Sequence, residues 1–92
     1  MESKIRTEEE ILKDFEKLGW VVVDGYKNFM LKKIEKEQDE FLEIHHHCYI
    51  SINKEKHTYS AIDLHCFNTH EYKLSMTEHK LLHELFTIWG WL

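Results

Sequence analysis

The same helix-start signal occurs twice in this sequence, once near each end. Thr7 is followed three residues later by Glu10, and Ser75 is followed at the same spacing by Glu78. In this capping-box pattern each side chain binds the other residue's backbone N–H, which satisfies donors that a helix start leaves unpaired. We therefore expect one helix over residues 8–18 and a second near the end of the chain. Apolar residues recur at helical intervals after the two signals, at Ile11, Leu12, Phe15 and Leu18, and at Leu81, Leu82, Leu85, Phe86, Ile88 and Trp89.

Between the two helices the sequence is typical of β-strands. The run 20–23 is aromatic and β-branched, and Asp24 and Gly25 follow it as a turn signal. A polar run at 36–39 and the residues 53–57 mark two further turns. The strands expected from these boundaries lie at residues 20–23, 28–35, 41–53 and 58–67.

These elements predict an α+β fold. We expect an N-terminal helix, a three- to four-stranded antiparallel β-meander and a C-terminal helix, with both helices on one face of the sheet. Residues 41–53 and 58–67 form the best-defined hairpin, and residues 68–70 are expected to open a loop toward the second helix. No repeat or low-complexity linker divides the sequence, so residues 1–92 are expected to form a single domain.

The composition limits the class of protein. Hydrophobic residues make up 42% and aromatic residues 13% of the 92 residues, which is enough apolar surface for folding without a disulfide or an obligatory metal. The formal net charge is −5 and no basic stripe is visible, which disfavours nucleic-acid binding. We expect a basic partner protein instead. The acidic residues behind this expectation gather at Glu8, Glu9 and Glu10, and again at Glu35, Glu37, Asp39, Glu40 and Glu43.

Two features of the sequence predict a cytoplasmic protein. Charged residues at Glu2, Lys4 and Arg6 interrupt the region where a signal peptide needs an apolar run, and no later segment approaches about 18 apolar residues. Cys48 and Cys66 lack close pairing motifs and are expected to be reduced and buried. We expect no membrane contact and a monomer or weak homodimer.

Three short segments give the chain a family likeness. The segments are Leu18-Gly19-Trp20, Ile50-Ser51-Ile52-Asn53-Lys54-Glu55-Lys56-His57-Thr58-Tyr59-Ser60 and Leu85-Phe86-Thr87-Ile88-Trp89-Gly90-Trp91. In the arrangement of these segments the chain resembles small phage and prophage proteins of low-GC Gram-positive bacteria. The resemblance covers nearly the whole chain and implies a phage setting, but its motifs are structural, so it transfers no catalytic residue. Some small acidic phage proteins with this helix, sheet, helix plan inhibit host defence systems, which is a likeness of fold alone.

Histidine is the most unusual component of the chain, with eight residues of 92 and a run of three at 45–47 inside a predicted strand. If the hairpin has a symmetric turn, His45 lies opposite His65 and His47 lies opposite Asp63. The four side chains then share one face, where imidazole and carboxylate groups suit Zn, Ni or Cu. We therefore predict a candidate metal site made of His45, His47, Asp63 and His65.

The same register, in which Asn53 lies opposite His57, gives the other face of the hairpin to the core. Because a neighbouring aspartate favours the protonated imidazole, we expect the pKa of His47 to lie above about 6.5. The residues expected on the core side are Ile44, His46, Cys48, Ile50, Ile52, Ile62, Leu64 and Cys66.

Other candidate sites have simpler explanations. His79 and His83 have metal-ligand spacing on the second helix, but the glutamate of a zincin motif is absent between them, so we interpret them as the edge of the apolar stripe. Cys48 follows His47, yet successive strand residues point to opposite faces, which argues against a thiol nucleophile. With no glycine-rich phosphate loop, the sequence predicts neither an enzyme nor a cofactor.

The function expected from these observations is a small acidic protein-interaction module of phage or prophage origin that acts on a host protein. Its acidic helix and the open face of its sheet are the surfaces expected to bind the partner. The alternative is a metal-binding module that uses the histidine and aspartate side chains at 45, 47, 63 and 65 on that open face.

Overall fold

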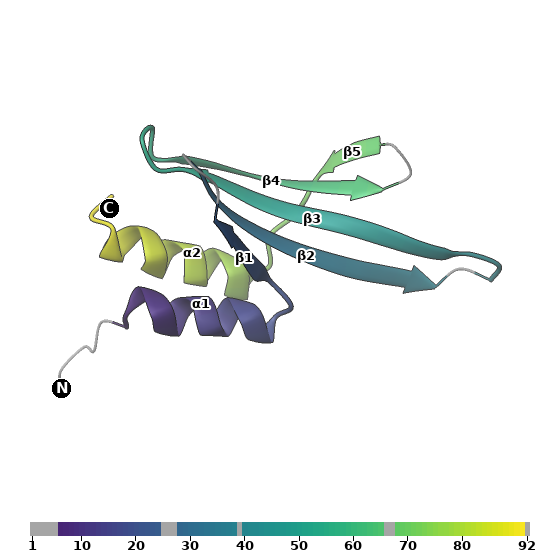
Figure 1. Cartoon of the computed structure of the whole chain (residues 1–92), viewed down its shortest axis with the longest axis horizontal. Coiled ribbons are helices and arrows are strands. Elements are labelled where there is room, and N and C mark those ends of the chain that lie inside the picture. Colours follow the sequence, from purple (N-terminus) through teal and green to yellow (C-terminus); the bar gives the residue numbers. More distant parts are fainter. Residues whose placement is uncertain (1–5, 25–27, 39, 66–67, 92) are drawn as a thin grey trace.

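The computed structural model describes residues 6–24, 28–38, 40–65 and 68–91, and within these ranges it contains two helices and five strands (Figure 1). The strands form one antiparallel sheet in the order β1-β2-β3-β4-β5, so each strand pairs with the next one along the chain. The predicted α+β class and the antiparallel sheet are confirmed. The elements are α1 (Glu8–Lys17), β1 (Val21–Asp24), β2 (Asn28–Gln38), β3 (Glu43–Asn53), β4 (Thr58–His65), β5 (Asn68–Glu71) and α2 (Met76–Ile88).

Both predicted capping boxes are present and fix the starts of the helices. In α1 the Thr7 hydroxyl accepts a 3.2 Å hydrogen bond from the Glu10 backbone N–H, and the Glu10 carboxylate accepts one of 3.2 Å from the Thr7 N–H. In α2 the Ser75 hydroxyl and the Glu78 carboxylate make the same exchange at 3.1 and 2.8 Å. A glycine with positive φ follows each helix, at 97° after α1 and 77° after α2, which is a conformation that ends helices at little steric cost only for glycine.

The sheet has five strands where the sequence predicted three to four. β5 lies where the sequence predicted a loop at 68–70. The strand was not predicted because all four of its residues are exposed and show no apolar alternation. β2 likewise continues to Gln38, through most of the predicted turn at 36–39. Its last residues were interpreted as a turn because they are polar, and in the structure they are exposed. Of the predicted turn residues, Gly25 and Asp39 lie outside the described residues.

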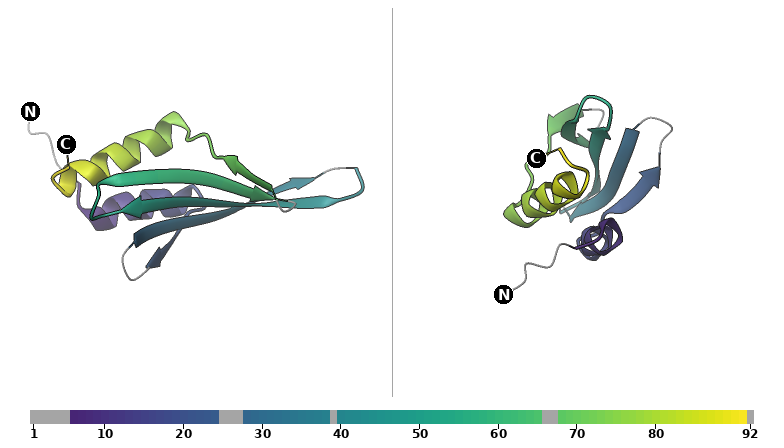
Figure 2. Two further views of the ribbon diagram at one scale, coloured as in Figure 1. Left: turned by 90° about the horizontal axis from the view of Figure 1, so that it is seen from above. Right: turned by 90° about the vertical axis from the view of Figure 1, so that its left-hand side faces the viewer.

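Both helices lie on the same face of the sheet and cover only one end of it (Figures 1 and 2). Arg6 links the two helices, because its guanidinium pairs with Asp14 of α1 and with Glu84 of α2. The core forms where the helices meet the sheet. Its buried side chains are Ile11, Phe15, Trp20, Phe29, Leu31, Cys48, Ile50, Ile52, Leu81, Leu82, Leu85 and Phe86.

The β2–β3 hairpin extends well beyond the helices and forms one end of a molecule with extents of 53 × 30 × 19 Å (Figure 1). We call residues 35–38 and 40–46 the arm. Its strands pair from Glu35 opposite His46 to Gln38 opposite Glu43. The arm is therefore held by strand pairing at a distance from the helices.

The register between β3 and β4 differs by one residue from the prediction. Asn53 lies opposite Thr58 instead of His57. The Asn53 side-chain oxygen accepts hydrogen bonds from the backbone N–H groups of Glu55 at 3.0 Å and Lys56 at 2.9 Å, and His57 has a left-handed φ of 56°. This asparagine-capped turn takes four residues between the strands, one more than the predicted turn.

A one-residue shift exchanges the faces of β4 relative to β3. Ile62 and Leu64, predicted in the core, lie on the face of the sheet away from the helices. Asp63 and His65 lie instead on the helix side, where Asp63 is directly opposite the buried Cys48. Cys66, predicted to be buried, lies outside the described residues.

Candidate functional site

The helix side of the sheet changes from apolar to titratable where the helix cover ends. Along β2 the residues on this side run from the buried Leu31 through Lys33 to Glu35 and Glu37. Along β3 they run from Ile50 and Cys48 to His46 and Ile44, and along β4 from Ala61 to Asp63 and His65. The register thus brings carboxylates and imidazoles together at the base of the arm, next to the core.

We call the group formed by Glu37, His46, Asp63, His65 and His70 the histidine cluster. His46 Nδ1 lies 3.1 and 3.2 Å from the two carboxylate oxygens of Asp63, and its Nε2 lies 2.8 Å from Glu37 Oε2. His65 Nδ1 is 3.8 Å from Asp63 Oδ1. The imidazole rings of His46 and His65 have centroids 4.4 Å apart, and His70, opposite Asp63 on β5, stacks on His65 at 5.0 Å. Four strands therefore contribute to one compact group.

The two ring nitrogens of His46 lie between carboxylates on different strands. The hydrogen bond to Glu37 raises the pKa of His46 above its ordinary value; partial burial opposes this, and the bond to Asp63 adds to it. His65 behaves differently. Its Nδ1 is a buried side-chain nitrogen with no hydrogen-bond partner among the described residues. A buried polar atom without a partner costs free energy, so this nitrogen is available for a ligand.

A second polar group lies between the histidine cluster and the core, around the carboxylate of Glu78, which is only 3% exposed. Trp20 Nε1 donates to it at 2.6 Å and the Tyr72 hydroxyl donates to it at 3.1 Å, while Lys33 Nζ stands 3.5 Å away. Lys33 also pairs with Glu35 at 2.6 Å. Every partner is an internal one, so we interpret this group as a structural tie between α2, β2 and the start of β1.

The ionisation states of this tie follow from its hydrogen bonds. Burial opposes the charge on Glu78, but the Ser75 backbone N–H and the Trp20 indole outweigh it, so the pKa of Glu78 lies below its ordinary value. Burial likewise opposes the charge on Lys33, and hydrogen bonds to Glu35 and Tyr72 nevertheless raise the pKa of Lys33. Both groups are charged and paired, which suits structure better than proton transfer.

The structure brings together two of the four predicted metal-site residues. Asp63 and His65 belong to the histidine cluster, whereas His45 and His47 lie on the opposite face of the sheet. The predicted contact between His47 and Asp63 is therefore wrong, and His46, which the sequence interpretation placed in the core, takes that position. The one-residue difference in register accounts for the exchange.

Two further members of the cluster, Glu37 and His70, were not predicted. Glu37 continues the alternation of Leu31, Lys33 and Glu35 along β2, and that period of two was the available signal. The interpretation of residues 36–39 as a turn concealed it. His70 gave no signal, because β5 has no apolar face.

The remaining candidates lie on the surface of α2 and in the core. His79 and His83 are exposed on α2. Cys48 is fully buried on the helix side of β3, and burial raises the pKa of its thiol to about 11. An unionised thiol in the core is a packing residue.

A second candidate surface lies at the far end of the arm. Phe41 is 89% exposed and Leu42 is 67% exposed, and they stand next to each other where β2 returns as β3. The exposed carboxylates of Glu40 and Glu43 flank them in the sequence. We call Phe41 and Leu42 the arm tip. Two large apolar side chains at the end of a projecting hairpin add nothing to the core.

The face of the sheet away from the helices is also apolar in part. Val21 is 60% exposed and Ile34 is 50% exposed, and together with Val23, Lys32 and Gly19 they line a shallow depression of about 420 Å³. This depression is at the edge of the sheet near β1, away from the histidine cluster. It is the open face that the sequence interpretation assigned to partner binding.

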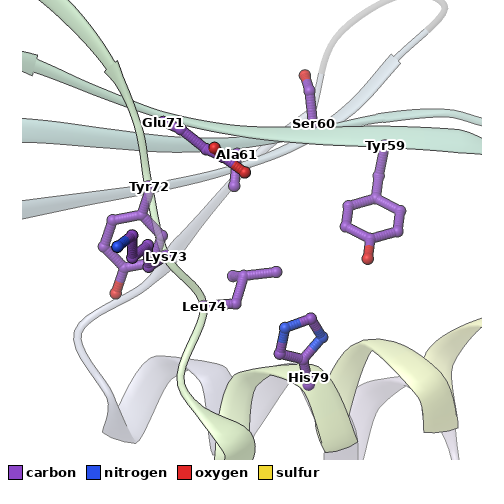
Figure 3. A pocket seen from close by; sticks show the side chains of 8 residues that line it. All are labelled: Tyr59, Ser60, Ala61, Glu71, Tyr72, Lys73, Leu74 and His79. Carbon is purple, nitrogen blue, oxygen red and sulfur yellow. The ribbon is translucent and has the colours of Figure 1, made fainter.

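A larger hollow of about 520 Å³ lies between β4, the segment that follows β5, and α2 (Figure 3). The Tyr59 ring points from β4 toward α2, and the His79 ring rises from α2 to meet the same space, whereas Ser60 points to the other side of the sheet. This alternation agrees with the observed register. The Tyr59 ring packs on Phe86 with centroids 5.4 Å apart. We interpret the hollow as the open rim of the core.

Comparisons with known proteins identify no relative: no protein-family model, no curated protein and no solved structure matches the chain. Within the described residues, neither helix is long and apolar enough to cross a bilayer.

Proposed function

We propose that this chain is a small, non-enzymatic protein-interaction module that presents its arm tip to a partner protein, and that it is of phage or prophage origin. The exposure of Phe41 and Leu42 at the end of the arm supports the interaction role. Burying one such side chain in a partner contributes about 1.5–3 kcal/mol. In many interfaces a few side chains that fill a pocket of the partner carry most of the binding energy. The phage or prophage origin rests only on the resemblance of the sequence to such proteins.

The charges around the arm tip define the partner further. Glu40 and Glu43 flank the tip in the sequence, and Glu43 pairs with Lys36 at 3.5 Å. The arm still carries four glutamates against one lysine, so the complementary surface is an apolar pocket with a basic rim. The same carboxylates oppose insertion into an anionic lipid surface. A basic protein is therefore the favoured partner, and a host protein is the class we propose.

We assign the acidic helix a smaller part in this surface than the sequence interpretation did. In α1 the Glu8 carboxylate accepts a 2.8 Å hydrogen bond from Trp89 Nε1, Glu10 completes the capping box, and Asp14 pairs with Arg6. These internal roles shift the proposed contact from the helix to the arm, with the adjoining open face around Ile34 as its extension.

The proposal is tested by comparing the wild-type chain with the double variant Phe41→Ser/Leu42→Ser. Proteins captured from a host lysate are identified, and each candidate is then purified and titrated into both chains by calorimetry. Met76→Ser is the matched control, because Met76 is an apolar residue of α2 that is 85% exposed. We expect a stoichiometric complex that Met76→Ser preserves and the double variant loses. A partner that binds the double variant as tightly as the wild type contradicts the proposal, as does self-association as the sole product.

A further inference from the structure

We propose that the base of the arm is a binding site for one divalent transition-metal ion, with zinc as the best fit, and that His46 Nδ1, one carboxylate oxygen of Asp63 and His65 Nδ1 are its protein ligands. The site is independent of the arm tip. It also differs from the set of histidines that the sequence predicted, because it uses the middle residue of the run 45–47 in place of its two neighbours.

The spacing of the three atoms agrees with a metal centre. Bonds of about 2.0–2.1 Å at a tetrahedral angle place neighbouring ligand atoms about 3.3 Å apart. Here His46 Nδ1 lies 3.2 Å and His65 Nδ1 lies 3.8 Å from the same carboxylate oxygen, Asp63 Oδ1. Candidate ligand atoms of all three residues lie within 4.8 Å of one another.

The environment of each imidazole supports the assignment independently. His46 Nε2 lies 2.8 Å from Glu37 Oε2, so when Nδ1 binds the ion the Nε2–H group donates a hydrogen bond to this carboxylate. That contact leaves Nδ1 as the metal-binding nitrogen and reproduces the carboxylate–histidine pairing found behind many metal ligands. His65 Nδ1 is buried and has no hydrogen-bond partner among the described residues. A metal ion supplies the missing partner.

The donor set decides the class of ion. Two imidazole nitrogens with one carboxylate oxygen suit zinc and its neighbours, whereas Mg²⁺ and Ca²⁺ prefer sites made of oxygen. Three protein ligands leave a fourth position for water. The ligands come from β3 and β4, and Glu37 from β2 orients one of them, so binding joins three strands at the base of the arm.

The run of three histidines provides matched controls for the test. Untagged protein is stripped with a chelator and titrated with ZnCl₂ by calorimetry, in the wild type and in His46→Gln, His65→Gln, His45→Gln and His47→Gln. We expect one equivalent of zinc, an affinity lowered at least about 100-fold in His46→Gln and His65→Gln, and an affinity within about threefold of the wild type in the other two. Equal losses in His46→Gln and His47→Gln, absence of binding, or several weak equivalents from adventitious histidine binding would each overturn the proposal.

A measurement on the wild type keeps the test independent of variant folding. Long-range ¹H–¹⁵N spectra of the histidine side chains identify which ring nitrogens bind the ion. We expect zinc to shift Nδ1 of His46 and of His65 and to leave the rings of His45 and His47 unchanged. Shifts confined to His45 and His47 contradict the site.

Discussion

The indole N–H of Trp20 donates a 2.6 Å hydrogen bond to the carboxylate of Glu78, so the residue that leads into β1 is fixed to the first turn of α2. The same carboxylate closes the Ser75 capping box. One side chain therefore both starts a helix and binds that helix to the sheet, and this double role is the basis of the first two predictions.

Replacing Glu78 with alanine is expected to lower the free energy of unfolding by about 2–4 kcal/mol, because the buried Trp20 indole N–H loses its acceptor and the helix loses its cap. Lys33 keeps its pair with Glu35. Glu10→Ala is the matched control, since Glu10 has the same capping-box position in α1 but is exposed. We expect it to cost about 0.3–1 kcal/mol. Denaturant melts measure both values, and equal losses would show that Glu78 has no role beyond the cap.

Glu78 also predicts how stability depends on pH. Its pKa is below the ordinary value in the folded chain, so the stability it contributes is present above the unfolded pKa and is lost as the pH falls through the folded pKa. The groups that face it are Lys33, Tyr72 and Trp20. Melts of the wild type and of Glu78→Gln between about pH 7 and pH 3 should therefore converge at the acid end. A constant difference over this range would contradict the prediction.

The core depends on side chains from both helices. Phe15 and Leu85 are fully buried, so Phe15→Ala and Leu85→Ala are each expected to lower the free energy of unfolding by about 2–5 kcal/mol. Met76→Ala, at an 85% exposed position, should change it by about 0.5 kcal/mol or less. Values below that level for Phe15 and Leu85 would mean that the helix faces are misassigned.

The Cys48 thiol is expected to be unreactive in the native protein, because it is buried and its pKa is raised to about 11. The variant Cys66→Ser leaves Cys48 as the only thiol of the chain. With a chromogenic disulfide reagent this variant should react slowly when native and at once when unfolded. Rapid labelling of the native variant contradicts the placement of Cys48.

Local sequence signals predicted the parts of the fold that depend on local chemistry. Thr7 with Glu10 and Ser75 with Glu78 form their capping boxes within a single turn of chain, so the helix starts were predictable. β5 was missed because no period-two apolar pattern distinguishes an exposed edge strand from a loop.

Only Asp63 and His65 of the four predicted site residues belong to the histidine cluster, and the turn between β3 and β4 is the reason. The register of β3 against β4 depends on two backbone hydrogen bonds to the Asn53 side chain and on the left-handed conformation of His57. Neither is visible in a hydrophobic pattern. A shift of one residue then places His46 beside Asp63 and His65, in place of its neighbours His45 and His47. The histidine-rich run indicated that β3 contributes to the site, and the turn decided which histidine of that run faces Asp63 and His65.

The register of this hairpin is the central structural claim, because the histidine cluster and the proposed metal site both depend on it. Hα–Hα contacts in a nuclear Overhauser spectrum measure it directly, since they join residues that lie opposite each other in an antiparallel pair. Close and wide opposite pairs alternate along an antiparallel ladder. The structure therefore predicts Hα–Hα contacts either for Cys48 with Asp63 and Ile50 with Ala61, or for His47 with Leu64. Contacts that join His47 to Asp63 would contradict the register and remove the metal site with it.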